Sequence, residues 1–195
     1  MEREKKYGKP PCIFKTDISF ARYSAIMNDY KKAKAKKMSY LYFDTGLQAS
    51  EAIFFLLNIR LRLRIKNGND YSLELKIHPP NNSSEDFYQK LSFLDIDLLF
   101  QGLIPNGVIK NKLVKLNVLR PVIWIKTTHV ARIKRFFYGG ILVLERTSCL
   151  NQTSYQIEFR SERPISVYNI RTIKKQLGLC GRLYFCSKLK QVWTK

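Results

Sequence analysis

Apolar and charged residues alternate strictly along two stretches in the first half of the chain. Residues 61–65 read Leu-Arg-Leu-Arg-Ile, and residues 73–77 read Leu-Glu-Leu-Lys-Ile. A β-strand points successive side chains to opposite faces, so Arg62 and Arg64 share one face of the first predicted strand. Each stretch taken alone also fits an amphipathic sheet whose charged side is in water.

The same alternation returns at 155–160, where Gln156, Glu158 and Arg160 share one face. Residues 2–6 are all charged, and a strand there would point Glu2, Glu4 and Lys6 to the same side. Guanidinium and ammonium groups bind phosphate oxygens, and carboxylates hold the divalent cations that accompany polyphosphates. Sheet faces that carry both kinds of group suit a metal–triphosphate site.

The remaining pattern predicts helices and further strands. Helical spacing covers 16–35, with a cap at Thr16 or Asp17, and short helices are predicted over 85–116. Strands are predicted over 121–160. A last helix runs from about Ser166 to Leu177 and ends at Gly178. This order predicts an antiparallel sheet with helices on its outside.

The ordered motifs resemble the CYTH superfamily, the triphosphate tunnel metalloenzymes that include thiamine triphosphatase, inorganic triphosphatases and class IV adenylate cyclase. They are Glu-x-Glu-x-Lys at 2–6, Tyr-Phe-Asp-Thr at 42–45, Leu-Arg-Leu-Arg at 61–64, Leu-x-Leu-Lys at 73–76 and Ile-Glu at 157–158. Together with the length, Ile-Pro-Asn-Gly at 104–107 resembles the bacterial YjbK-type branch most. The resemblance runs from Glu2 to about Lys188. It implies an α+β fold, an antiparallel eight-stranded β-barrel with helices packed outside, as one domain over 1–195.

The resemblance also implies roles for individual side chains and an Mg²⁺ or Mn²⁺ cofactor. Catalytic carboxylates would be Glu2, Glu4 and Glu158; metal ligands would be Glu2, Glu4, Glu145 and Glu158; phosphate-binding residues would be Lys6, Arg62, Arg64, Lys76, Arg132 and Lys188. Arg135 competes with Arg132 for the arginine of the central strand.

The sequence departs from the family pattern mainly among the acids. Gln156 stands where the first member of a late Glu-x-Glu pair is expected, and Glu145 replaces an aspartate. Glu74 stands where a small hydroxyl residue is common, and Arg160 where another acid is frequent. The implied function is metal-dependent hydrolysis of inorganic or organic triphosphates. Two alternatives stay open: a catalytically weakened protein that binds triphosphate, polyphosphate, a nucleotide or an RNA end, and a class IV adenylate cyclase-like enzyme.

Composition adds a strong positive charge. The 195 residues carry a formal net charge of +20, with lysine clusters at 31–37, 110–115 and 174–175. Such a field attracts polyanions of any type, so a nucleic-acid partner is an open expectation. The four cysteines have no CxxC spacing, and neither an N-terminal signal segment nor a membrane-spanning apolar run is recognisable. We therefore expect a cytoplasmic protein that does not enter membranes.

Overall fold

The computed structural model describes residues 12–29, 34–48, 50–79, 84–161, 165–179 and 184–185. The chain divides into two compact units. The middle unit consists of Lys36–Val130 and Ser148–Gln152, and the terminal unit of Met1–Ala35, Ala131–Thr147 and Thr153–Lys195. The expectation of a single domain stays a prediction.

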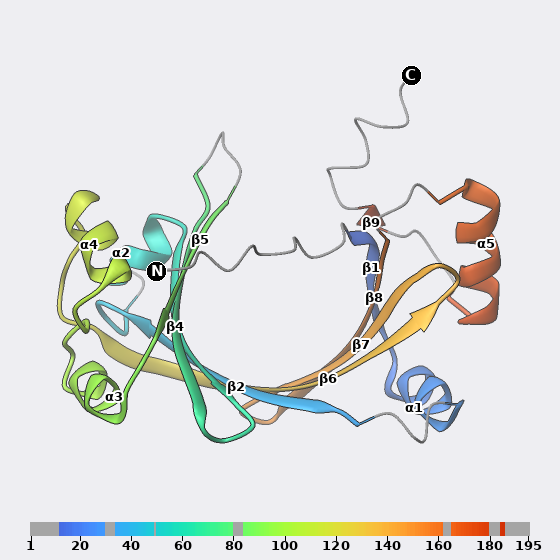
Figure 1. The fold of residues 1–195 in the computed structure, drawn as a ribbon, viewed down its shortest axis with the longest axis horizontal. Helices are drawn as coiled ribbons and strands as arrows, with labels where there is room; N and C mark the ends of the chain where they lie inside the picture. Colours follow the sequence, from blue (N-terminus) through green and yellow to red (C-terminus); the bar gives the residue numbers. More distant parts are fainter. Residues whose placement is uncertain are drawn as a thin grey trace, which may run out of the picture. The chain divides into compact units, whose positions relative to one another are not determined.

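The middle unit contains a sheet in the strand order β5-β4-β3-β2-β6 (Figure 1). Its strands are β2 (Lys36–Asp44), β3 (Ile59–Lys66), β4 (Asp70–Ile77), β5 (Glu85–Lys90) and the first part of β6 (Ile123–Phe137). Strands β2 to β5 pair antiparallel. Asn67 and Gly68 have positive φ in the turn between β3 and β4, a conformation that glycine and asparagine adopt at low cost. This short connection sets the register of the two alternating strands.

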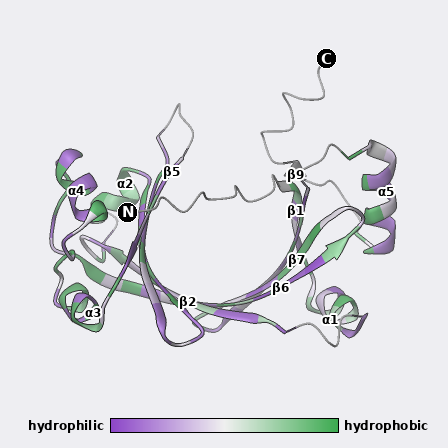
Figure 2. Cartoon of the chain, viewed as in Figure 1, coloured by the Kyte–Doolittle hydropathy of each residue, from purple (hydrophilic) through white to green (hydrophobic). Residues whose placement is uncertain are grey.

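One face of this sheet packs against the helices α2 (Ile53–Leu56), α3 (Phe93–Phe100) and α4 (Val108–Lys115), as Figure 1 shows. The largest fully buried residues there are Leu61 and Leu63 of β3, Leu73 and Leu75 of β4, and Phe54, Leu99, Ile109 and Leu113 of the helices. Figure 2 shows hydrophilic and hydrophobic segments along α4, whose Ile109 and Leu113 are buried in the core under the sheet. The leucines of the alternating strands therefore form the core, and the charged residues face away from it.

The motif Tyr-Phe-Asp-Thr has a structural role at the end of β2. The Oδ1 of Asp44 accepts a hydrogen bond from the Phe54 N–H at 3.0 Å, and its Oδ2 accepts one from the Phe55 N–H at 2.9 Å. The Thr45 hydroxyl accepts a third from the Ile53 N–H at 2.9 Å. These contacts satisfy the N–H groups that a helix start leaves unpaired. The motif thus anchors α2 to the sheet.

The terminal unit contains the second part of β6 and the strands that follow it in the order β6-β7-β8-β1-β9. The elements are β7 (Gly140–Cys149), β8 (Gln152–Arg160), β1 (Cys12–Ile18) and β9 (Tyr184–Phe185), with the helices α1 (Phe20–Asp29) and α5 (Val167–Gln176). Phe14, Ile157, Phe159 and Ile173 are fully buried in its core. Helix α5 confirms the sequence prediction: the Ser166 hydroxyl caps its start, and Gly178 follows its end with φ of 54°.

Two predicted helical regions were partly wrong. Residues 12–18 form strand β1, in which Thr16 and Asp17 pair with β8, and helix α1 begins only at Phe20, with the Ser19 hydroxyl accepting from the Arg22 N–H. Residues 85–90 form strand β5 rather than a helix, because they complete the edge of the middle sheet against β4. In both places pairing with a neighbouring strand outweighs the local periodicity.

The α+β class and an antiparallel sheet of eight main strands are confirmed, whereas hydrogen bonds among the described residues do not close this sheet into a barrel. Within the described ranges the sheet has nine strands, and its order begins at β5 and ends at β9, so hydrogen bonds do not close it. The ninth, β9, is a two-residue strand that pairs with β1. No helix among the described residues is long and apolar enough to cross a lipid bilayer.

Candidate functional site

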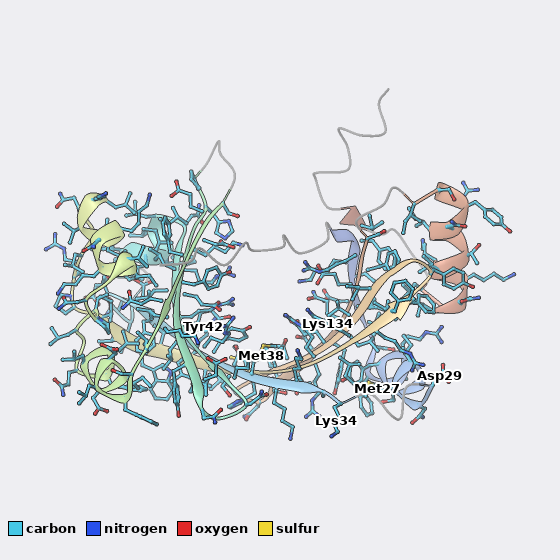
Figure 3. The ribbon with its side chains drawn as sticks, viewed as in Figure 1. Met27, Asp29, Lys34, Met38, Tyr42 and Lys134 are labelled. Atoms are coloured by element: carbon cyan, nitrogen blue, oxygen red, sulfur yellow. The ribbon has the colours of Figure 1, made fainter. Side chains whose placement is uncertain are left out.

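The polar face of the middle sheet lies opposite α2, α3 and α4; we call it the β2–β5 polar face. Figure 3 labels Tyr42 and shows it on this side of the strands. Residues that are direct partners in antiparallel strands share one face. The register aligns two rows there: Tyr42–Arg62–Glu74–Tyr88 and Tyr40–Arg64–Ser72–Lys90.

Glu74 joins Arg62 and Arg64 of β3, and we call these three residues the arginine cluster. Its Oε2 lies 2.8 Å from Arg62 Nε and 2.7 Å from Arg62 Nη2, and its Oε1 lies 2.9 Å from Arg64 Nη1. The Glu74 side chain is 7% exposed, whereas those of Arg62 and Arg64 are 25% and 30% exposed. One buried carboxylate therefore serves two guanidinium groups, and the cluster keeps an excess positive charge.

Arg62 is held from several sides. Its Nη1 donates to the Tyr42 hydroxyl at 3.4 Å, and its guanidinium lies 4.1 Å from the centre of the Tyr40 ring, a cation–π distance. Burial alone would lower the pKa of Arg62, but Glu74 and both tyrosines outweigh it and raise that pKa above its ordinary value. The guanidinium stays charged and fixed in place.

Lys76 extends the cationic face along β4. Its Nζ lies 3.4 Å from Asp86 Oδ1 on β5, with both side chains about one-third exposed. His78 follows β4, and its pKa is lowered first by burial and then by the positive charges of Lys76 and Arg60. Burial is the larger cause, and the two cations act in the same direction while Asp86 opposes them.

The terminal unit also carries arginines on a polar face, but each has its own carboxylate. Arg132 on β6 donates to Glu145 Oε2 on β7 through Nε at 2.7 Å and through Nη2. Arg160 Nη2 lies 2.7 Å from Glu158 Oε1 on the same strand. Figure 3 labels Lys134, which lies on the side of β6 away from α1. We call Arg132–Glu145 and Arg160–Glu158 the terminal-unit pairs. Arg135, which competed with Arg132 for the arginine of the central strand, is exposed and lies on the opposite face of β6.

Asp17 is a polar-face residue that the sequence interpretation missed. It is the direct partner of Gln156, whose Nε2 donates to Asp17 Oδ1 at 2.9 Å. Lys15 and Glu158 are the neighbouring partners. Residues 15–18 read Lys-Thr-Asp-Ile, which does not alternate between charged and apolar residues, so no strand signal marks Asp17, and the predicted helix over 16–35 includes it.

The described carboxylates do not form a divalent-cation site by themselves. Glu145 and Glu158 each accept from an arginine, and the neutral Gln156 holds Asp17. Among the described residues, no three His, Cys, Asp or Glu side chains lie together as possible metal ligands. Glu2 and Glu4, as well as the predicted phosphate-binding Lys6 and Lys188, lie outside the described residues. The metal assignments therefore stay predictions.

Comparison with solved structures shows the fold. A "putative adenylate cyclase" from Bacillus halodurans aligns with a TM-score of 0.68 and 21% identity, covering 96% of this chain and 100% of that one. HpAC1 from Hippeastrum, a protein with a dominant triphosphatase activity, aligns with a TM-score of 0.68 and 19% identity over 92% of each chain. No protein-family model and no curated protein matches the sequence. Both neighbours are less than 25% identical to this chain, so they show the fold alone, and the YjbK-type branch stays a prediction.

Proposed function

We propose that this protein belongs to the CYTH superfamily and binds triphosphate compounds on the β2–β5 polar face. The observation that carries the proposal is the arginine cluster, in which Arg62 and Arg64 share the single carboxylate of Glu74. Guanidinium groups suit phosphate because they present several N–H donors in a planar fork. Lys76 and Lys90 on the neighbouring strands of the same face add positive charge.

The chemistry we propose is hydrolysis of a phosphoric anhydride bond. In such a reaction charge spreads over the oxygens of the transferred phosphoryl group, so fixed cations that contact those oxygens lower the barrier. Arg62 and Arg64 would bind and orient the phosphoryl oxygens. The family resemblance also predicts Mg²⁺ or Mn²⁺ as the cofactor, which Glu2 and Glu4 would hold. The triphosphatase activity of HpAC1, which shares the fold, supports this reading.

The second candidate is a protein that captures a triphosphate, polyphosphate, nucleotide or RNA end with little turnover. The support for this candidate comes from the predicted metal ligands. Glu145 and Glu158 form ion pairs with arginines, and the neutral Gln156 stands where a carboxylate is expected. The net charge of +20 also favours polyanions. The Bacillus halodurans neighbour is named a "putative adenylate cyclase". Formation of a cyclic nucleotide from ATP is therefore a variant of the enzyme proposal.

One set of assays separates these functions. Purified protein is titrated with tripolyphosphate, ATP and thiamine triphosphate by calorimetry, and phosphate release is measured with Mg²⁺, with Mn²⁺ and with a chelator. Metal-dependent phosphate release supports the hydrolase, and binding without release supports the capture protein. A cyclic nucleotide detected by chromatography would identify the cyclase. Absence of binding to all three compounds would contradict the triphosphate proposal.

A further inference from the structure

A groove in the middle unit lies where α3, α4 and the segment that leads into β6 meet, on the side of the sheet that carries the helices (Figure 1). Its volume is about 410 Å³. Small-molecule sites usually have volumes of roughly 300–1,000 Å³ and mostly apolar walls. The apolar walls of this groove come from Leu98, Leu103, Ile104, Pro105, Leu119 and Pro121. The proposed triphosphate chemistry uses none of these residues.

Backbone hydrogen bonds and the core fix the walls of the groove. The Leu103 N–H donates to the Leu98 carbonyl at 2.9 Å, which closes the end of α3. The Val122 N–H donates to the Gly102 carbonyl at 2.9 Å and so ties the segment before β6 to the loop after α3. Ile104 belongs to the core of the middle unit and is 5% exposed. The walls are therefore in place before a ligand arrives, which lowers the entropy cost of binding.

The charged side chains that line the groove are both cationic. They are Lys110 and Arg120, and no carboxylate lines the groove. The ion pairs among the described residues include neither of them, and Lys110 Nζ donates to the neutral Asn106 Oδ1 at 2.9 Å. Helix α4 adds positive potential, because its first turn holds Lys110 but no acid and no capping side chain. An anionic group in the groove would gain from both cations.

We propose that this groove binds a single-chain amphiphile with an anionic head, of which a medium-chain fatty acid is the simplest example. The carboxylate accepts hydrogen bonds from Arg120 and Lys110. The alkyl chain packs on Leu98, Leu103 and Leu119. The size of the groove favours such a ligand over a folded protein partner, whose interface takes roughly 800 Å² on each side. The site is independent of the triphosphate proposal, which uses the opposite face of the sheet.

The first test compares ligands that share one alkyl chain. Decanoate is titrated by calorimetry below the concentration at which it forms micelles, beside decyltrimethylammonium and decyl maltoside. The last two should bind at least about tenfold more weakly, because they lose the charge-assisted contacts of the carboxylate. Affinity should rise by up to about fourfold for each methylene from hexanoate to decanoate. Equal affinity for the three heads, or no binding of decanoate, would overturn the proposal. Binding to anionic phospholipid vesicles without binding to free decanoate would do the same, since it would indicate a membrane contact.

Two matched pairs of variants locate the binding site. Arg120→Gln should weaken decanoate binding about tenfold, whereas Lys115→Gln, which removes an exposed charge of α4 outside the groove, should leave it unchanged. Leu103→Asn should weaken binding about fivefold through lost apolar contact. Its control is Leu94→Asn on α3, outside the groove; both leucines are exposed, so both variants should fold. Equal decanoate affinity within either pair would place the amphiphile elsewhere and overturn the assignment.

Discussion

The middle and terminal units present similar residues on their polar sheet faces but balance the charges differently. In the middle unit, Glu74 serves both Arg62 and Arg64. In the terminal unit, Arg132 and Arg160 each have a glutamate of their own. A shared carboxylate leaves an excess of positive charge that an anionic ligand can neutralise, whereas a one-to-one pair satisfies itself. For this reason we place the proposed anion binding in the middle unit rather than in the terminal unit.

The largest expected effect is that of Glu74→Gln. It leaves two partly buried guanidinium groups without a counter-charge, so the free energy of unfolding should fall by about 2–3 kcal/mol, somewhat less than for a fully buried pair. Added tripolyphosphate should recover more stability in the variant than in the unchanged protein, because it supplies the missing negative charge. Thermal unfolding with and without tripolyphosphate measures both effects.

Glu145→Gln is the matched control in the terminal unit. It removes the carboxylate of one arginine, with 19% and 28% of the two side chains exposed, and should cost about 1 kcal/mol. Tripolyphosphate should not restore that loss preferentially. Equal recovery in both variants would mean that the two faces bind anions alike, and the comparison would fail.

Gln156→Glu tests the metal role of the terminal unit. From the sequence alone we expect higher metal affinity and faster phosphate release with little change in stability. The structure adds Asp17, which now accepts a hydrogen bond from Gln156; a second carboxylate opposite it should lower stability by about 0.5–1 kcal/mol without metal. Mg²⁺ or Mn²⁺ should reverse this loss in a thermal-shift titration. Unchanged stability on adding either ion would argue against a metal site at this strand.

The smallest expected effect concerns His78. Burial, Lys76 and Arg60 lower its pKa below 6.5, so the folded protein holds this proton less tightly than the unfolded chain does. The contribution of His78 is therefore unfavourable at low pH: stability falls as the pH drops from 6.5 through the folded pKa, and it recovers as the pH rises. An anion bound at the β2–β5 polar face should raise that pKa by neutralising nearby cations. NMR titration of the His78 ring with and without tripolyphosphate measures the change; no upward movement would place the anion elsewhere.

Local pattern alone determined which residues share a face. The alternation in β3 and β4 placed Leu61 and Leu63 in the core and Arg62 and Arg64 on the polar face, as the structure has them. It also determined helix α5, because a serine cap and a following glycine act within a few residues of the helix ends. Both signals depend on near neighbours in the chain, which is why they can be read without a tertiary structure.

Only the tertiary structure decided which charges meet. That Glu74 reaches both arginines, that Arg132 takes Glu145, and that Asp17 lies opposite Gln156 all follow from strand register. The same pairing makes 16–18 and 85–90 parts of strands, although the sequence predicted helix for both. A period of two determines the side of a strand on which a residue lies, but the partner across the ladder comes from residues far away in the sequence.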